Sequence, residues 1–209
     1  MHRNVHNLIQ IEKEIQSNIL DLNDITKLPK IIAVSKTHPM TSILPLIHHG
    51  HLDFGENKVQ EALDKWQDTK NKIDNLNLHM IGKLQSNKVK QAISIFDYIH
   101  SVDNLKLAEK IASEEIKQEK KIKIFIQVNI GDEAQKSGIE ISNLDNFYKC
   151  CINDLNLNVV GLMCLPPFDQ DVSPYFSKMR DVHLRLRLKE LSMGMSNDYL
   201  KAIKFNSSY

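Results

Sequence analysis

The chain has 209 residues, of which 42% are hydrophobic and 25% are charged, and its 27 basic residues balance 26 acidic ones. This length and apolar fraction suit one folded domain over residues 1–209 and exclude a mainly disordered chain. A net charge of +1 gives no general attraction to nucleic acid or to anionic membranes.

Neither a membrane span nor a secretion signal is expected. No apolar run approaches the roughly 20 residues that a bilayer crossing needs, and the N-terminus lacks a charged-then-apolar pattern. The cysteines, Cys150, Cys151 and Cys164, form no C-x-x-C pair for zinc or redox chemistry. We therefore expect a cytoplasmic protein with neither a nucleic-acid nor a membrane partner.

Helical and strand-like segments alternate along the chain. A first amphipathic helix is predicted over residues 5–22, and further helices over 59–73 and 105–116, from apolar residues at steps of three and four. Ser173 and Pro174 resemble an N-cap and a first helical position. Strands are expected to begin near Ile31, Leu52, Leu78, Tyr98, Lys123, Val159 and Glu190.

The fold class predicted from this alternation is α/β with a parallel sheet. No G-x-G-x-x-G follows a strand, which weakens the case for an open dinucleotide-binding sheet. Repeated β/α units favour a (β/α)8-type TIM barrel, although such barrels usually need about 250 residues. Only seven strands are recognisable, so the last strand and helix are expected to be missing.

Lys36 is the most suggestive candidate for chemistry. It follows a buried run that starts at Ile31, so its amine is expected at the mouth of the barrel, where active sites lie. Desolvation there would favour the free amine that a Schiff base requires. The alternative is an ordinary solvated lysine at the end of a strand.

Ser196 is a candidate for anion binding. Together with Gly194 it could offer a hydroxyl and backbone donors at the start of a short helix, where barrels often bind phosphate. The alternative is a plain helix N-cap at Ser196, and both interpretations can hold together.

Other polar clusters have simpler interpretations. His48, His49 and His51 could bind a metal, but no cysteine or carboxylate completes a site, and a polar helix end is favoured. His79 is interpreted as a hydrogen-bonded structural histidine. The acidic pairs Glu114-Glu115 and Asp132-Glu133 are interpreted as solvated faces.

A set of short strings, in order from about residue 31 to 203, resembles one family. The strings are Ala33–Thr37, Phe54–Asn57, Ile81–Lys88, His100–Asp103, Gln127–Ile130, Lys136–Gly138, Gly161–Met163, Pro166-Pro167 and Leu191–Asp198. They are similar to those of the pyridoxal phosphate homeostasis proteins, single-domain relatives of the alanine racemase barrel (the type III fold of pyridoxal-phosphate proteins).

The resemblance implies binding of pyridoxal 5′-phosphate without established turnover. Lys36 matches the lysine that holds this cofactor as a Schiff base, Asn57 a residue that lines it, and Met195 and Ser196 the loop that touches its phosphate. The implied role is to keep intracellular pools of vitamin B6 and amino acids balanced. A monomer with this small molecule as its partner is expected.

The C-terminus departs from the family pattern. Where relatives continue with Gly-Ser-Thr and then an arginine-bearing strand, this chain has Asn206, Ser207, Ser208 and Tyr209. Ser207 and Ser208 are the expected remaining phosphate contacts. The arginine expected beside the pyridine nitrogen is absent, and the first and seventh strands would be left with open edges.

Two alternatives stay open beside a non-catalytic cofactor-binding protein. One is a degenerate barrel, truncated or decaying, that no longer binds the cofactor. The other is a minor amino-acid racemase, which would need a positioned acid on each face of its substrate, whereas only Lys36 can be named.

Overall fold

Seven parallel strands form the sheet, and they pair in the order in which they occur in the chain. The computed structural model describes residues 2–20, 28–133, 135–168 and 170–209. The strands are β1 (Ala33–Val34), β2 (Asp53–Glu56), β3 (Asn77–Met80), β4 (Tyr98–Val102), β5 (Lys123–Val128), β6 (Asn158–Cys164) and β7 (Glu190–Ser192). Six of them begin within one residue of the predicted start, and β1 begins two residues later.

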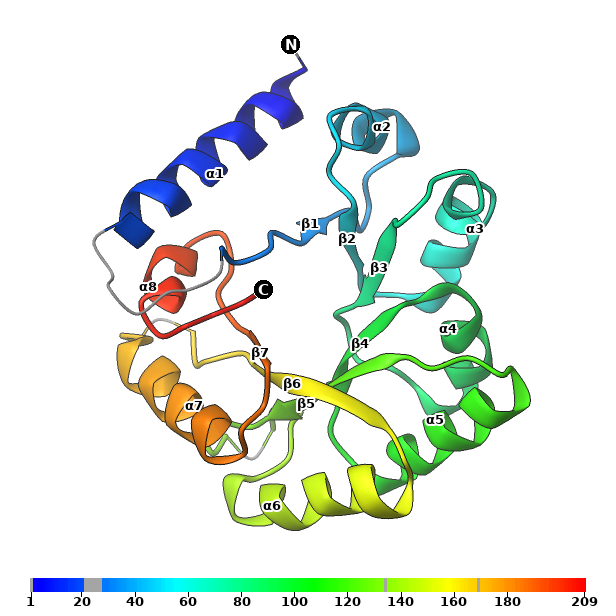
Figure 1. Ribbon diagram of the computed structural model, residues 1–209, viewed down its shortest axis with the longest axis vertical. Coiled ribbons are helices and arrows are strands. Elements are labelled where there is room, and N and C mark those ends of the chain that lie inside the picture. Colours follow the sequence, from blue (N-terminus) through cyan, green and yellow to red (C-terminus); the bar gives the residue numbers. More distant parts are fainter. Residues whose placement is uncertain (1, 21–27, 134, 169) are drawn as a thin grey trace.

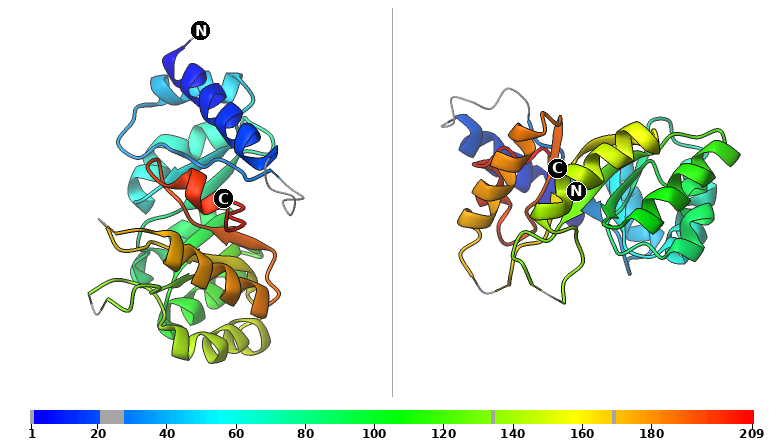
Figure 2. Two further views of the ribbon diagram at one scale, coloured as in Figure 1. Left: turned by 90° about the vertical axis from the view of Figure 1, so that its left-hand side faces the viewer. Right: turned by 90° about the horizontal axis from the view of Figure 1, so that it is seen from below.

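Helices follow every strand, and one more precedes the sheet. They are α1 (Arg3–Leu20), α2 (Met40–His48), α3 (Val59–Lys70), α4 (Val89–Ile95), α5 (Leu105–Lys117), α6 (Ile141–Lys149), α7 (Ser173–Arg185) and α8 (Tyr199–Ile203), with short turns η1 (Ser86–Lys88) and η2 (Cys150–Asp154). Figure 1 shows the sheet curled into an incomplete ring with the helices outside it, and Figure 2 shows the same curl from two other sides. The α/β barrel prediction is confirmed as a seven-stranded partial barrel.

Most of the apolar runs that predicted the strands are buried on both faces, and β1 is an exception, with Val34 46% exposed. Strand β4 has all five of its residues buried, and β5 has all but the first. On the outer side, Phe54 of β2 packs against Trp66 of α3 with ring centroids 4.9 Å apart, and neither side chain is exposed. Burial on both faces explains why these strands carry continuous apolar runs rather than an alternating pattern.

Some predicted helix boundaries need correction. Val172, not Ser173, is the N-cap of α7, and Pro174 is the second residue of the helix. Asp171, which lies outside the helix, accepts hydrogen bonds from the N–H and the hydroxyl of Ser173. Helix α3 ends at Lys70 rather than at residue 73. The end of the first predicted helix, residues 21 and 22, lies outside the described residues.

The pair Glu114-Glu115 is not a solvated face, contrary to the sequence interpretation. Both residues are buried on α5. Glu114 pairs with Lys110 and Lys117, while Glu115 pairs with Lys121 and accepts the Ile122 N–H at 2.7 Å. Paired and hydrogen-bonded carboxylates tolerate such burial.

The start of α5 offers a local test of stability. Asn104 is its N-cap, and the Asn104 side chain accepts the Leu107 N–H at 3.0 Å. We expect Asn104→Ala to lower the free energy of unfolding by about 1 kcal/mol, measured by urea denaturation. Asn71→Ala, at the exposed C-cap of α3, is the control and should change it by less than about 0.5 kcal/mol; equal effects would contradict the capping role.

The C-terminal residues occupy the opening between β7 and β1. Ser208 N–H donates to Leu191 O of β7 at 2.8 Å, and Ser208 O accepts the Lys30 N–H at 2.9 Å, three residues before β1 begins. The chain end therefore lies between the two sheet edges (Figure 1). The expected open edge of β7 is corrected accordingly, because the tail bonds along it. On the other side the tail reaches Lys30, which precedes β1, and Val34 of β1 is 46% exposed.

Helix α1 covers the same opening from outside. It contacts both α2 and α8, and its Glu14 accepts a hydrogen bond from the Tyr199 hydroxyl of α8.

Within the described part of the chain, no helix combines the length and apolar character that a membrane crossing requires.

Candidate functional site

Lys36 lies one residue beyond the buried Ser35, at the carboxyl end of β1. Its side chain is exposed and makes no hydrogen bond or ion pair within the described residues. The sequence-based expectation of a desolvated amine is therefore wrong for this structure, because β1 itself is only partly covered, with Val34 46% exposed, and Lys36 extends into solvent beyond it. The amine faces solvent at the edge of the sheet where all the strands end.

The backbone on both sides of Lys36 is held by neighbouring elements. Ser35 N–H donates to Gly55 O at 2.9 Å, and Lys65 Nζ of α3 donates to Ser35 O at 2.7 Å. Thr37 has a φ of 64°, in the left-handed region, and its N–H donates to Glu61 Oε1. Lys36 is thus the free side chain of a turn whose main chain is fixed.

Glu56, the last residue of β2, is the buried anchor of this turn. Its side chain is 0% exposed, and its Oε1 accepts from Ser35 Oγ at 2.7 Å, Lys65 Nζ at 2.9 Å and Trp66 Nε1 at 2.9 Å. Its Oε2 is buried without a hydrogen-bond partner among the described residues. The ion pair with Lys65 keeps the buried carboxylate compensated.

Asn57 and Gly82 form the adjoining part of the site, after β2 and β3. A Cβ on Gly82 would lie 2.4 Å from Asn57 O, so only glycine allows this approach of the two chains. The Asn57 side chain is half-buried and makes no hydrogen bond within the described part of the chain. Its amide is therefore available to a ligand.

The loop after β7 places Met195 and Ser196 at the same edge. Both side chains are exposed, and the Ser196 hydroxyl has no partner in the described residues. The predicted N-cap at Ser196 is wrong, because α8 begins at Tyr199 with Asp198 as its N-cap. Asp198 instead accepts the Met195 N–H, which closes the loop.

The hydroxyl groups of Ser207 and Ser208 form hydrogen bonds to the main chain of β7 and of the residue that follows it. Ser207 Oγ donates to Met193 O at 2.6 Å, and Ser208 Oγ accepts the Leu191 N–H at 2.7 Å. Ser207 is also buried. The structure thus gives both serines a role in holding the tail, and it leaves Lys36, Asn57 and Ser196 as the predicted site residues with unengaged polar side chains.

The inner face of the sheet carries a polar chain, of which the sequence indicated only His79. His79 Nε2 lies 3.0 Å from Asp53 Oδ1, His79 Nδ1 lies 3.0 Å from His100 Nε2, and His100 Nδ1 lies 2.9 Å from Ser192 Oγ. Both imidazoles are fully buried. The interpretation of His79 as a hydrogen-bonded structural residue is confirmed.

Burial sets the titration of this chain. Desolvation lowers the pKa of His79, although the hydrogen bond to Asp53 opposes the shift, and it lowers the pKa of His100 further. Burial works against ionisation of Asp53 as well, but the hydrogen bond from His79 brings the pKa of that carboxyl below its ordinary value. The histidines are therefore neutral near pH 7 and Asp53 is ionised.

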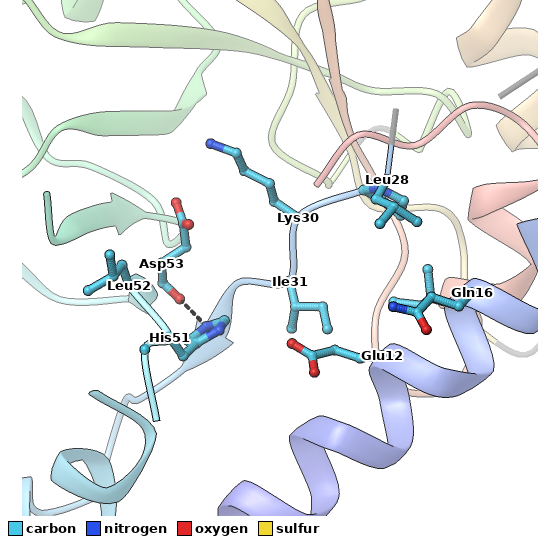
Figure 3. Close-up of a pocket in the computed structure, with 11 residues that line it drawn as sticks. Glu12, Gln16, Leu28, Lys30, Ile31, His51, Leu52 and Asp53 are labelled. Atoms are coloured by element: carbon cyan, nitrogen blue, oxygen red, sulfur yellow. Dashed lines mark hydrogen bonds between the residues drawn. The ribbon is translucent and has the colours of Figure 1, made fainter. Parts of the chain in front are cut away.

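A cavity of about 330 Å³ lies at the opposite end of the strands. Lys30 and Asp53, at the amino ends of β1 and β2, line it together with Glu12 of α1. Figure 3 shows the Lys30 and Asp53 side chains extending away from Glu12. This cavity is remote from Lys36 along β1, so it is not part of the candidate site.

The histidines near residue 50 do not form a metal site in the structure. His48 ends α2, His49 is its C-cap, and His51 Nε2 lies 2.8 Å from Asp53 O. The described residues contain no group of three or more His, Cys, Asp or Glu side chains that could hold a metal ion.

Comparison with known proteins decides the family. The model of the alanine racemase N-terminal domain matches residues 12–208. The pyridoxal phosphate homeostasis protein of Aquifex aeolicus is 38% identical over 84% of this chain and 80% of its own length. This chain belongs to the pyridoxal phosphate homeostasis protein family.

Other members of this family match almost the whole chain. The pyridoxal phosphate homeostasis protein of Haemophilus influenzae is 33% identical, over 97% of this chain and 90% of its own. A structure of PipY from Synechococcus elongatus PCC7942 with PLP bound superposes with a TM-score of 0.80 at 31% identity, covering 93% of this chain and 95% of PipY. The family resemblance noted in the sequence is therefore confirmed.

Proposed function

We propose that this chain binds pyridoxal phosphate and takes part in balancing the cellular pools of this cofactor and of amino acids, with Lys36 as the point of covalent attachment. The observation that carries the proposal is the free, exposed Lys36 side chain on a turn whose backbone is hydrogen-bonded on both sides. Membership of the pyridoxal phosphate homeostasis family and similarity to PLP-bound PipY support it.

The residues at this edge of the sheet fit such a ligand. Lys36 would hold the cofactor through its amine, and the cofactor's aldehyde would supply the carbon to which that amine can bond. When bound, the cofactor supplies an electron-accepting ring. Asn57 would line that ring, and Met195 and Ser196 would contact the phosphate with backbone and hydroxyl groups.

Ser207 and Ser208 have a more limited part in this proposal. Their hydroxyl groups are already engaged with the backbone of β7. They would stabilise the Met195–Ser196 loop indirectly, by holding the chain that precedes it. A direct phosphate contact would require each hydroxyl group to give up its present main-chain partner.

We further propose that the protein acts without turning over a substrate. Its curated relatives are named as homeostasis proteins rather than as enzymes. A racemase needs an acid on each face of the substrate carbon, and Lys36 is the single candidate that the site residues offer. A monomer acting in the cytoplasm is the expected form, which sedimentation and cell fractionation would test.

The decisive experiment is an absorbance titration with pyridoxal phosphate, followed by borohydride reduction and peptide mapping. We expect a new visible band and a label on Lys36, and Lys36→Ala should abolish both. Lys83→Ala, which removes another exposed lysine at the end of β3, is the matched control and should retain them. A label on another lysine would overturn the assignment, and a folded protein without the band would support the degenerate-barrel alternative.

A further inference from the structure

The turn that carries Lys36 is attached to α3 through two charged side chains. Lys65 Nζ donates to Ser35 O, the carbonyl before Lys36, and Glu61 Oε1 accepts from the amide after it, at Thr37. The two side chains also pair with each other, with Lys65 Nζ and Glu61 Oε1 3.0 Å apart. One ion pair therefore joins both peptide groups that flank Lys36.

Thr37 shows that this attachment constrains the backbone. A β-branched residue rarely adopts a positive φ, because its Cβ approaches the neighbouring peptide oxygen. Thr37 nevertheless has a φ of 64°, and His38 N–H closes the turn onto Ser35 O at 3.1 Å. An unfavourable local conformation persists where surrounding contacts determine it, and the Glu61 carboxylate is the contact at the Thr37 amide.

The attachment extends into the core. Lys65 also donates to Glu56, the buried carboxylate that accepts from Trp66. Helix α3 is fixed by Trp66, which is 0% exposed. Glu61 differs from these residues because its side chain is 27% exposed and lies on the helix surface. Its removal therefore leaves the buried part of the network intact.

We propose that Glu61 is a positioning residue for Lys36, holding the Thr37 peptide so that the Lys36 side chain leaves the turn in the direction needed to bond an aldehyde ligand. The role rests on the proposed function of Lys36. Glu61 touches neither the ligand nor the lysine amine; it acts through the backbone. Without it, the turn relaxes toward negative φ at Thr37, and the direction of the Lys36 side chain changes.

Two readouts on one set of variants test the proposal. The first is the dissociation constant for pyridoxal phosphate from the visible band, with borohydride mapping of the label to Lys36. The second is amide hydrogen exchange over residues 35–38 in the protein without added cofactor. Glu61→Ala should weaken binding roughly tenfold, as expected for losing one charged hydrogen bond, and should speed exchange at Thr37.

Matched variants separate positioning from general damage. Glu61→Gln keeps an oxygen that can accept the Thr37 N–H, so it should restore most of the binding. Asp64→Ala removes a carboxylate from the same helix that pairs with Gln60 on the exposed surface, and it should behave as wild type. Melting temperatures should be similar for all three variants.

The outcomes distinguish this proposal from the one on which it rests. If wild-type protein carries no label on Lys36, the proposed function fails. If wild type is labelled but Glu61→Ala matches it in both affinity and Thr37 exchange, the positioning role is wrong. If Glu61→Gln is as impaired as Glu61→Ala, the charge rather than the backbone contact matters, which also overturns the proposal.

Discussion

Acidification from about pH 7.5 to pH 5.5 is expected to lower the free energy of unfolding by up to about 3 kcal/mol through His79 and His100. Burial lowers the pKa of both imidazoles below the ordinary value of 6.5. The unfolded chain therefore binds more protons than the folded one once the pH drops below about 6.5. The stabilisation is complete above that pH and is lost progressively below it, until the pH reaches the folded-state pKa of each histidine.

The geometry of the polar chain explains why protons are excluded. A neutral imidazole has one donor and one acceptor, so hydrogen bonds can run in one direction from Ser192 through His100 and His79 to Asp53. If both imidazoles were protonated, His79 Nδ1 and His100 Nε2, which lie 3.0 Å apart, would both be hydrogen-bond donors and would repel each other. Tyr98 stacks on His79 and Phe125 on His100, with centroids 4.3 and 4.2 Å apart, so each imidazole has one face covered by an aromatic ring.

Neighbouring charged groups influence this titration without reversing it. Asp53 raises the pKa of His79 less than burial lowers it, while Lys30 lowers it further. Lys123 lies over the Tyr98 ring at 4.6 Å, and Lys30 over the Tyr209 ring at 5.4 Å. Of these cations, Lys30 adds to the cost of a protonated His79, whereas Asp97 raises the pKa of this imidazole.

Urea denaturation at a series of pH values measures the effect. Two other histidines, His51 and His183, also have a pKa lowered by burial and contribute in the same direction. The variant His100→Gln removes the contribution of His100 and should reduce the slope of stability against pH; because His100 also bonds to His79, the contribution of His79 changes with it. The exposed His48 provides the control His48→Gln; an unchanged slope in His100→Gln would contradict the explanation.

The strands could be predicted from the sequence because each contains a short apolar run, and in β2 to β5 every residue after the first is buried. Local pattern suffices for such elements, and β2 to β7 begin within one residue of their expected positions. Burial of Glu115 could not be predicted, because it depends on Lys121 and on the Ile122 amide, which only the folded chain brings to this carboxylate. Glu114 pairs with Lys110 and Lys117 of the same helix, and this local spacing does not show that the side chain is buried. A charged pair on a helix has the same local pattern whether or not its partners cover it.

The sequence predicts candidate site residues but not the contacts that support them. The position of Lys36 after an apolar run is visible in the sequence. Lys65 donates to Ser35 O, and Glu61 accepts from the Thr37 amide, only because one face of α3 points toward β1. Burial of Trp66 in the core determines which face that is. The hydrogen bond between His100 and Ser192 joins residues 92 positions apart in the sequence. The two residues meet only because the sheet is curled.

The tail at residues 207–209 is expected to be a major source of stability, because it bonds both to β7 and to the segment that leads into β1. Ser208 connects Leu191 of β7 to Lys30 before β1, and Ser207 bonds to Met193. The Tyr209 ring lies on the inner face, 5.6 Å from the rings of both His79 and Phe125. Unpaired strand edges and an uncovered aromatic cluster would otherwise face water.

We expect Tyr209→Ala to lower the free energy of unfolding by about 2–3 kcal/mol, below the usual cost for a fully buried aromatic ring because Tyr209 is only half-buried. Tyr209→Phe is the matched control and should cost less than about 0.5 kcal/mol, since the Tyr209 and Tyr98 hydroxyls are 3.4 Å apart, too far for a strong bond.

Amide exchange shows whether the tail joins the two edges or merely covers them. The Lys30 amide donates to Ser208 O and the Leu191 amide to Ser208 Oγ, so both should exchange faster in Tyr209→Ala. The Phe54 amide in the middle of β2 should stay protected, which excludes global unfolding as the cause. If Lys30 and Leu191 keep their protection while stability falls, the ring contributes by packing alone and the barrel edges are held by α1 and α8, which cover the same opening from outside.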